Sequence, residues 1–144
     1  MDAGKLLSRR NLVLTLPALA AISAYGTEKN VLPSETYLFK NLKTNSHAGY
    51  TGRAVLEGYT HQGFRIAMHE SKLDAGAMPH AAHHHKHEEM FMMREGELEV
   101  KINGKTTHAG PGDVVYVASN EEHGVRNIGK VAAQYFVIEF GTDE

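Results

Sequence analysis

The sequence predicts an all-β domain, either a sandwich or a barrel, and three observations support this fold class. Apolar and polar residues alternate with a period of two from residue 36 onward. Gly, Asn and Ser interrupt these runs at intervals of roughly ten residues, a spacing typical of sandwiches and barrels. No sustained helical stripe follows residue 25. The period alone does not decide between the two architectures.

The expected strands of the first half are short β-prone runs between turn-forming residues. They are residues 36–42 (TYLFKNL), 52–58 (GRAVLEG) and 63–73 (GFRIAMHESKL). Residues 97–104 (ELEVKING) alternate more cleanly, with an apolar residue at every second position. The pair Asn103-Gly104 then supplies the positive φ angles of a two-residue hairpin turn, and KTTH forms the returning strand.

Two later runs are almost uninterrupted in their apolar character. Residues 114–118 read VVYVA, and residues 132–140 read AAQYFVIEF. A strand without a polar face is covered on both sides, so we expect both runs to lie buried between other elements. The tight turn AGPGD opens the first of them.

The first residues predict an export signal. Three basic residues, Lys5, Arg9 and Arg10, precede an apolar run over residues 12–22, and small residues follow it. This run is shorter than the roughly 20 residues of a membrane-spanning helix, so we expect no stable membrane insertion after processing. The stretch SRRNLVL resembles a twin-arginine signal, which implies export to the periplasm in a folded state. If the segment is instead a buried amphipathic helix, the protein is cytoplasmic.

Length and composition limit the organisation of the chain. Its 144 residues have room for one domain. We divide it into a signal peptide (1–24), an N-terminal extension with a first edge strand (25–49) and a barrel domain (50–141). The absence of Cys excludes disulfides, thiolate metal sites and a cysteine nucleophile. The formal net charge of −2, without a basic block, argues against nucleic acid as a partner.

A histidine cluster lies in the stretch HAAHHHKHEEMFMMREG, residues 80–96. In an extended segment His83, His85, His87 and Glu89 point to one face, because residues two apart share a face. Imidazole nitrogen and carboxylate oxygen together are a common ligand set for divalent transition metals. The spacing alone does not say which histidine is surplus, and an exposed loop with adventitious metal affinity is the alternative interpretation.

The cluster resembles the first motif of the cupin superfamily. In that motif a Gly is followed by His-x-His, a Glu and a second Gly, and the matching residues here are Gly76, His83, His85, Glu89 and Gly96. Six residues rather than five separate the first Gly from the first His.

A second motif of the same family follows the stretch GPGDVVYV. Its Gly, His and Asn correspond to Gly112, His123 and Asn127. Ala118 replaces the Pro of this motif, and Asn120 replaces its Gly. Asn tolerates the left-handed conformation that Gly favours, so we expect the turn to be preserved.

The resemblance covers roughly residues 50–140 and implies a fold, a cofactor and an oligomeric state. The fold is a small double-stranded β-helix, or jelly-roll barrel, often found as a homodimer. The cofactor is one divalent transition metal ion in the barrel mouth (Fe, Mn, Ni, Cu or Zn). The ligands that the resemblance implies are His83, His85, Glu89 and His123.

Several further residues are candidates for the surroundings of the metal. Candidates for lining a pocket are Phe91, Met93, Tyr116 and Asn127. For Phe91 and Met93, which share a face with Glu89, filling the core is the alternative. For Tyr135 and Arg126, a structural role is the simpler interpretation. We expect His87 and His84 to lie beside the ligands or at the rim, and give His80 no role. Polar or turn contexts predict surface positions for His47, His61, His69 and His108.

Four ligands leave two positions open on an octahedral ion, whereas a four-coordinate zinc ion would be saturated. The leading hypothesis is a metal-dependent oxidoreductase of dioxygenase type that acts on a small phenolic or enolisable molecule. The alternatives are a non-catalytic, metal-dependent binding protein for a small molecule, and an isomerase, epimerase or decarboxylase. A histidine-rich metal buffer is a further alternative.

Overall fold

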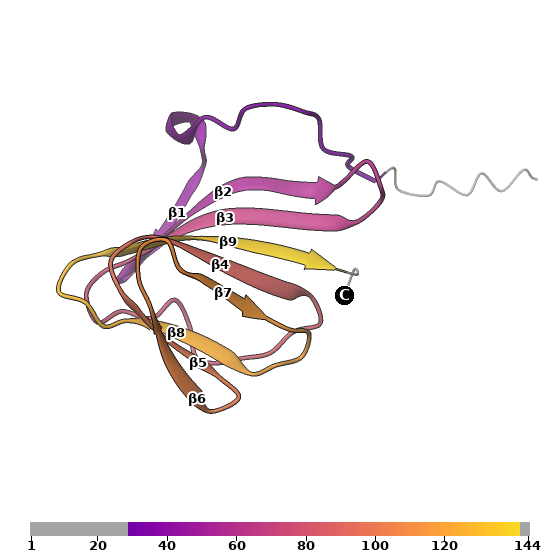
Figure 1. Ribbon diagram of the computed structural model, residues 1–144. Helices are drawn as coiled ribbons and strands as arrows, with labels where there is room; N and C mark the ends of the chain where they lie inside the picture. The colour runs from indigo at the N-terminus through magenta and orange to yellow at the C-terminus, as the bar shows by residue number, and fades with distance from the viewer. Residues whose placement is uncertain (1–28, 142–144) are drawn as a thin grey trace, which may run out of the picture.

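The computed structural model describes residues 29–141, so the predicted signal peptide, residues 1–24, lies outside the described residues. Within them the chain forms nine strands and one 3-10 helix, which confirms the all-β prediction (Figure 1). The elements of the first half are η1 (Phe39–Asn41), β1 (Thr44–His47), β2 (Tyr50–Tyr59) and β3 (Arg65–Leu73). The elements of the second half are β4 (Glu88–Glu95), β5 (Leu98–Ile102), β6 (Lys105–Ala109), β7 (Val114–Val117), β8 (His123–Asn127) and β9 (Ala133–Gly141).

The strands form two antiparallel sheets. The larger has the order β1-β2-β3-β9-β4-β7, and the smaller has the order β6-β5-β8. In Figure 1 the large sheet fans out from β1 at the top to β7, and the small sheet lies below it. Strand β9, the last in sequence, pairs with β3 on one side and β4 on the other. This crossover places residues from both halves of the chain around one interior.

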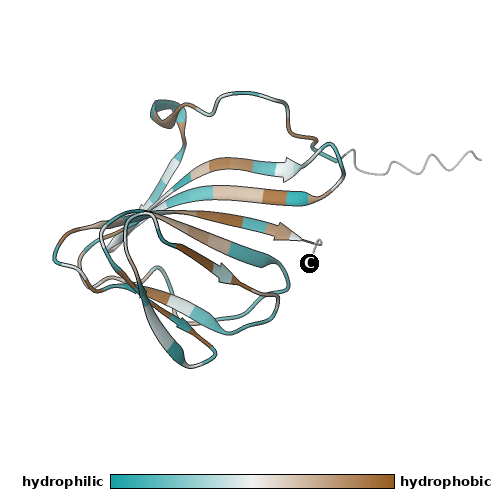
Figure 2. Ribbon diagram, viewed as in Figure 1, coloured by the Kyte–Doolittle hydropathy of each residue, from teal (hydrophilic) through white to brown (hydrophobic). Residues whose placement is uncertain are grey.

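The interior is packed with apolar side chains at one end. Leu73, Leu98, Val100 and Val117 are completely buried, and Tyr135 is almost so. These side chains come from four strands of both sheets, and burying each contributes about 1.5–3 kcal/mol. Figure 2 shows apolar residues alternating with polar ones along several strands, as expected for sheets with one buried face. We call this end of the barrel the closed end.

The hairpin predicted from residues 97–104 is confirmed. Strands β5 and β6 pair from Leu98–Ala109 to Ile102–Lys105. Asn103 and Gly104 between them have φ angles of 47° and 79°, as a two-residue turn of this hand requires.

The prediction of a strand over residues 36–42 is wrong. This stretch contains helix η1, and the first strand of the described residues is β1, which forms an edge of the large sheet. The Phe39 ring lies against the guanidinium carbon of Arg53, at 4.7 Å from its centroid. The helix thus contacts a side chain of β2 and does not pair with a strand.

The expectation that residues 114–118 are covered on both faces is also wrong. Val114 is 55% exposed and Tyr116 is 50% exposed, whereas Val117 is fully buried. The reason is topological, since β7 is an edge strand of the large sheet and only its inner face meets the core. Strand β9, in contrast, lies within the sheet, and its outer face is half-buried.

Gly96 permits the tight connection from β4 to β5. Its φ is 76°, and a Cβ atom at this position would lie 2.6 Å from the Cα of Ala133. Only a residue without a side chain fits both the conformation and the approach of β9.

Among residues 29–141 we find no helix with the length and apolar character needed to cross a bilayer.

Candidate metal centre

His83 and His123 are brought together by backbone pairing. The N–H of His83 donates to the carbonyl of His123 at 3.0 Å, and the N–H of His123 donates back at 2.8 Å. This isolated antiparallel bridge fixes the loop before β4 against the first residue of β8. The two imidazole centroids consequently lie 4.8 Å apart.

His85 is held by the turn that precedes β8. The N–H of Asn120 donates to the carbonyl of His85 at 2.7 Å. Asn120 has a φ of 63°, so the left-handed conformation expected at this position is confirmed. The turn of the second motif therefore positions a histidine of the first motif.

Glu89 lies on the inner face of β4 and approaches two of these imidazoles. Its Oε1 is 3.2 Å from Nε2 of His85, and its Oε2 is 3.1 Å from Nε2 of His123. The residue is 8% exposed. A carboxylate this deeply buried is costly unless it meets cations or hydrogen-bond donors, and here it faces imidazole nitrogens.

Three buried imidazole nitrogens have no hydrogen-bond partner: Nδ1 of His83, Nε2 of His85 and Nε2 of His123. The ligand atoms of these three residues lie within 4.8 Å of one another. Buried polar atoms are rarely left without a partner, and a shared cation would satisfy all three nitrogens at once. The donor set therefore fits a divalent transition metal ion.

The opposite ring nitrogens fix the tautomer that two of these residues have in their neutral form. Nδ1 of His85 lies 2.8 Å from the carbonyl of His87, and Nδ1 of His123 lies 2.9 Å from the carbonyl of Glu121. A carbonyl only accepts, so each Nδ1 carries a proton and donates it. In this tautomer each ring directs the lone pair of Nε2 toward the centre, the arrangement usual for metal-bound histidine.

The pKa values of the cluster favour ligand formation at neutral pH, with one exception. Burial lowers the pKa of His83, and the neighbouring imidazoles lower it further. Burial would raise the pKa of Glu89, but His123 and His85 outweigh it, so the pKa is lowered. Burial would lower the pKa of His123, but Glu89 and the Glu121 carbonyl raise it above its usual value. A metal ion competes with a proton at His123, so its affinity falls as the pH is lowered.

His87 lies beside the ligands, as expected. Its ring stacks on that of His85 at a centroid distance of 3.6 Å. Its Nε2 is 3.6 Å from Oε1 of Glu89 and 3.8 Å from Oε2 of Glu139. His85, His87 and Glu89 form a second group whose ligand atoms are close enough to share an ion. His84 is exposed, on the opposite side of the segment.

The four implied ligands line a cavity of about 310 Å³, and of the predicted pocket residues Phe91 joins them. Met93 does not line the cavity and is buried in the apolar core. Tyr116 lies exposed on the outer face, where Glu88 and burial raise its pKa. Asn127 is completely buried elsewhere. The prediction that these three line the pocket is therefore corrected.

The cavity also has walls that the sequence prediction missed. Its further lining residues include His47, Tyr50, His69, Ser71, Tyr135 and Glu139. The surface prediction for His69 is wrong, because its side chain faces the interior from β3. His47 is exposed but stacks on Tyr50 at the edge of the cavity. Alternation within residues 63–73 could have identified His69, which shares the face of the buried Ser71 and Leu73.

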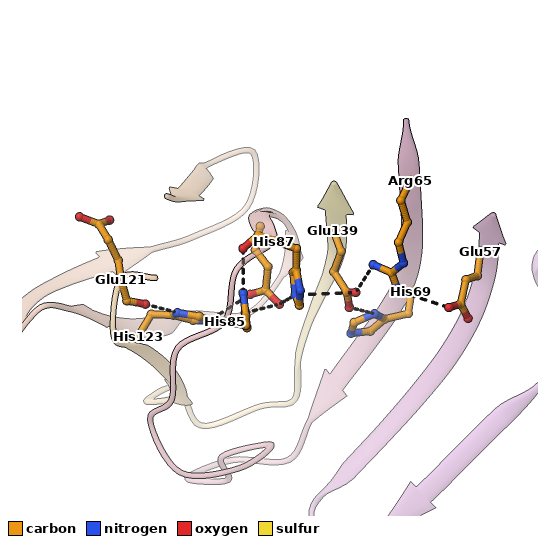
Figure 3. A network of polar contacts seen from close by, with 9 residues as sticks. Glu57, Arg65, His69, His85, His87, Glu121, His123 and Glu139 are labelled. Carbon is orange, nitrogen blue, oxygen red and sulfur yellow. Dashed lines mark hydrogen bonds and ion pairs between the residues drawn. The ribbon is translucent and has the colours of Figure 1, made fainter. Parts of the chain in front are cut away.

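Polar contacts continue from the candidate ligands across the large sheet. Figure 3 shows a network that runs from Glu121 and His123 through His87 and Glu139 to Arg65 and Glu57. Glu139 lies 3.8 Å from both His69 and Arg65, and Arg65 lies 3.3 Å from Glu57. Charged groups therefore extend from the metal centre along the inner faces of β9, β3 and β2.

Comparisons with known proteins give one family and many structures. Residues 69–139 match the family model of the Cupin domain. No curated protein matches this chain.

Similar solved structures include an RmlC-like cupin from Shewanella frigidimarina (20% identity, TM-score 0.63, covering 77% of this chain and 95% of that one). Another is a predicted oxalate decarboxylase from Thermotoga maritima (19% identity, TM-score 0.62, 75% and 100%). A third is a sugar phosphate isomerase of the cupin superfamily from Silicibacter pomeroyi (14% identity, TM-score 0.60, 75% and 76%). At these identities the likeness to the structures shows the fold. Residues 69–139, just under half of the chain, are in addition similar in sequence to the Cupin domain, which agrees with this fold.

Proposed function

We propose that this protein is a metal-dependent oxidoreductase of dioxygenase type that acts on a small phenolic or enolisable molecule. The observation that carries the proposal is the convergence of three buried, unpartnered imidazole nitrogens and Glu89 on one cavity. His83, His85, Glu89 and His123 would hold one ion. When bound, a redox-active ion with two open positions would act as a Lewis acid for the substrate and bring dioxygen chemistry to the site.

The walls of the cavity suit an aromatic or enolic substrate. Phe91 lies edge-on to Tyr135, with ring centroids 5.9 Å apart, and offers an apolar surface beside the ligands. On the wall formed by β2 and β3, the Ser71 hydroxyl donates to the Tyr50 hydroxyl at 3.4 Å. These hydroxyls would orient the oxygen atoms of a substrate, whereas the aromatic rings would exclude water from it.

A second candidate needs the metal but no oxygen. It is an isomerase, epimerase or decarboxylase, in which the ion would polarise a carbonyl group. The names of two neighbours, an isomerase and a predicted decarboxylase, favour it. The same ligands would serve, because a Lewis acid requires only one open position.

One experiment distinguishes the two candidate functions. The untagged protein is loaded with Fe²⁺, Mn²⁺, Ni²⁺ or Cu²⁺ and mixed with a panel of catechols and β-diketones, with and without oxygen. Oxygen consumption with oxygenated products, absent from the His123→Ala variant, is the expected result. Turnover under argon would favour the second candidate. Binding without turnover under both conditions would show a non-catalytic binding protein.

We also propose export and self-association. The basic leader and apolar run of residues 1–24 support secretion to the periplasm, which fractionation of expressing cells tests. The homodimer implied by the family stays a prediction, and light scattering of the purified protein tests it. A small organic ligand, not nucleic acid, is the expected partner.

A further inference from the structure

A second, larger cavity adjoins the metal cavity. It has a volume of about 570 Å³, and its walls come from strands β2 and β3 and from residues 35–43, which lead into β1. His69 and Glu139 line both cavities. Their side chains, 3.8 Å apart between Nδ1 and Oε1, therefore form the partition between the two spaces.

We propose that the two cavities form one binding site for an elongated molecule. Its oxygen-bearing head occupies the metal cavity, and its uncharged aryl or acyl tail passes His69 and Glu139 into the second cavity. This inference rests on the proposed function, because it takes the metal cavity as the place of the head. It adds the class of ligand: a metal chelator with a long apolar substituent.

The walls of the second cavity match an uncharged tail. Its lining residues include apolar ones from three parts of the chain: Leu38, Leu42, Leu56, Ala67 and Met68. Arg65, the less exposed of the two basic residues in the wall, is compensated by Glu57 and Glu139, at 3.3 and 3.8 Å. Glu35 and Lys43, also in the wall, carry opposite charges. These residues carry three acidic and two basic groups, so the wall has one excess negative charge and would not select an anionic tail.

The volumes also favour an elongated occupant. Sites for small molecules commonly enclose roughly 300–1,000 Å³, and the metal cavity of about 310 Å³ is at the lower limit of that range. With the second cavity, the site approaches the upper limit. The metal cavity alone would hold a single ring, and the extension holds a substituent of several carbon atoms.

A homologous series of ligands tests the inference. The full-length protein is loaded with Co²⁺, and catechols with a 4-methyl, 4-butyl or 4-hexyl group are titrated against the cobalt absorption bands. Each added methylene group is expected to lower Kd by about two- to fourfold, as its surface leaves water. A Kd that does not change from methyl to hexyl would overturn the inference.

A variant that fills part of the second cavity tests the same inference on the protein side. Ala67 is 9% exposed and faces this cavity from β3, two residues before His69. We expect Ala67→Leu to abolish most of the gain from the longer chains and to leave Kd for 4-methylcatechol within about twofold, since less than the volume of one side chain is added away from the head. The control is Val114→Leu on the outer face, which should leave the whole series unchanged. A chain-length dependence that survives Ala67→Leu would contradict the inference.

A metal-free measurement distinguishes failure of the inference from failure of the proposed function. If 4-methylcatechol leaves the cobalt bands unchanged, the proposed head site is wrong. The second cavity is then tested with a hexyl-dansyl probe on metal-free protein. Fluorescence enhancement that Leu38→Asp and Ala67→Leu both reduce would support an apolar tail site, and no enhancement would overturn it. Enhancement only after removal of residues 1–24 would assign the cavity to the chain's own N-terminal segment and also overturn the inference.

Discussion

Two residues at opposite ends of one strand show how the barrel uses buried polar groups. His123 and Asn127 begin and end β8, on the same face, and are 2% and 0% exposed. The side chain of Asn127 donates to the carbonyls of Leu73 and Val131 and accepts from the N–H of Gly129. Nε2 of His123 has no hydrogen-bond partner. A polar group whose bonds are complete within the chain stabilises the fold, and one whose bonds are incomplete is suited to a ligand from outside.

Two buried carboxylates repeat this contrast. Glu70, on the outer face of β3, is 1% exposed and lies 3.0 Å from Arg53 and 3.2 Å from Arg94. Glu89, on the inner face of β4, meets imidazoles instead of guanidinium groups. Arginine is permanently charged and completes an ion pair, whereas a neutral imidazole leaves the carboxylate available to a metal.

The largest effect should follow from removing the hydrogen bonds that the Asn127 side chain makes. Asn127→Leu would leave two carbonyls and one N–H buried without their partner, at about 1–3 kcal/mol each before relaxation. We expect the free energy of unfolding in urea to fall by about 3–5 kcal/mol. Metal content per folded chain should not change. A variant that unfolds like the wild type would contradict a structural role for this amide.

The corresponding change at the other end of β8 is His123→Ala, which should abolish metal binding. Elemental analysis of protein purified without a tag should give one ion per wild-type chain and none for the variant. With metal at 100 times Kd, the wild type should gain about 2.7 kcal/mol in unfolding free energy, and the variant should gain none. Retention of the ion by His123→Ala would show that the centre lies elsewhere in the histidine cluster.

His87→Ala tests whether His87 is a metal ligand or only a neighbour of the ligands. His87 stacks on His85 and approaches Glu89, so it orients two ligands. We expect metal affinity to fall about 10–100-fold, as for other groups that support ligands, with the stoichiometry unchanged. Competition with a chromophoric chelator measures it. Complete loss of the ion would make His87 a ligand, and an unchanged affinity would remove it from the centre.

The smallest effect concerns pH and His69. Burial lowers the pKa of His69, although Glu139 and Glu89 act in the opposite direction. Above about pH 6.5, the usual pKa of the unfolded residue, His69 is neutral in both states and its contribution to stability is complete. As the pH falls below that value, the unfolded state takes up the proton first, so this contribution is lost.

The unfolding free energy of metal-free wild type, minus that of His69→Gln, should therefore decrease as the pH is lowered from 7 to 5. Urea titrations in the presence of a chelator measure both proteins. A difference that stays constant or grows would show that His69 is not buried as a neutral ring.

Local signals account for the parts of the fold that could be predicted. The hairpin at Asn103-Gly104 followed from φ preferences of two adjacent residues. The errors occurred where neighbours in space decide the outcome. Residues 36–42 have strand-like composition but form η1, and residues 114–118 are apolar but lie at a sheet edge.

The candidate site divides in the same way. Motif spacing put His83, His85, Glu89 and His123 forward together, and the structure brings them to one cavity. Asn127 shares the face of His123, so alternation could not separate the two roles. Only the loop of residues 128–131, which supplies hydrogen-bond partners for the amide, does so.

By itself, the sequence determined an all-β chain, because alternation is a property of neighbouring residues, and its resemblance to two motifs put forward a set of candidate metal ligands. Tertiary structure alone decided that Glu139 of β9 meets His69 of β3 beside the metal cavity, and that Tyr116 and Asn127 do not line this cavity. The physical reason is that strand pairing between β3, β9 and β4 sets these distances, and no local preference encodes which strands become neighbours.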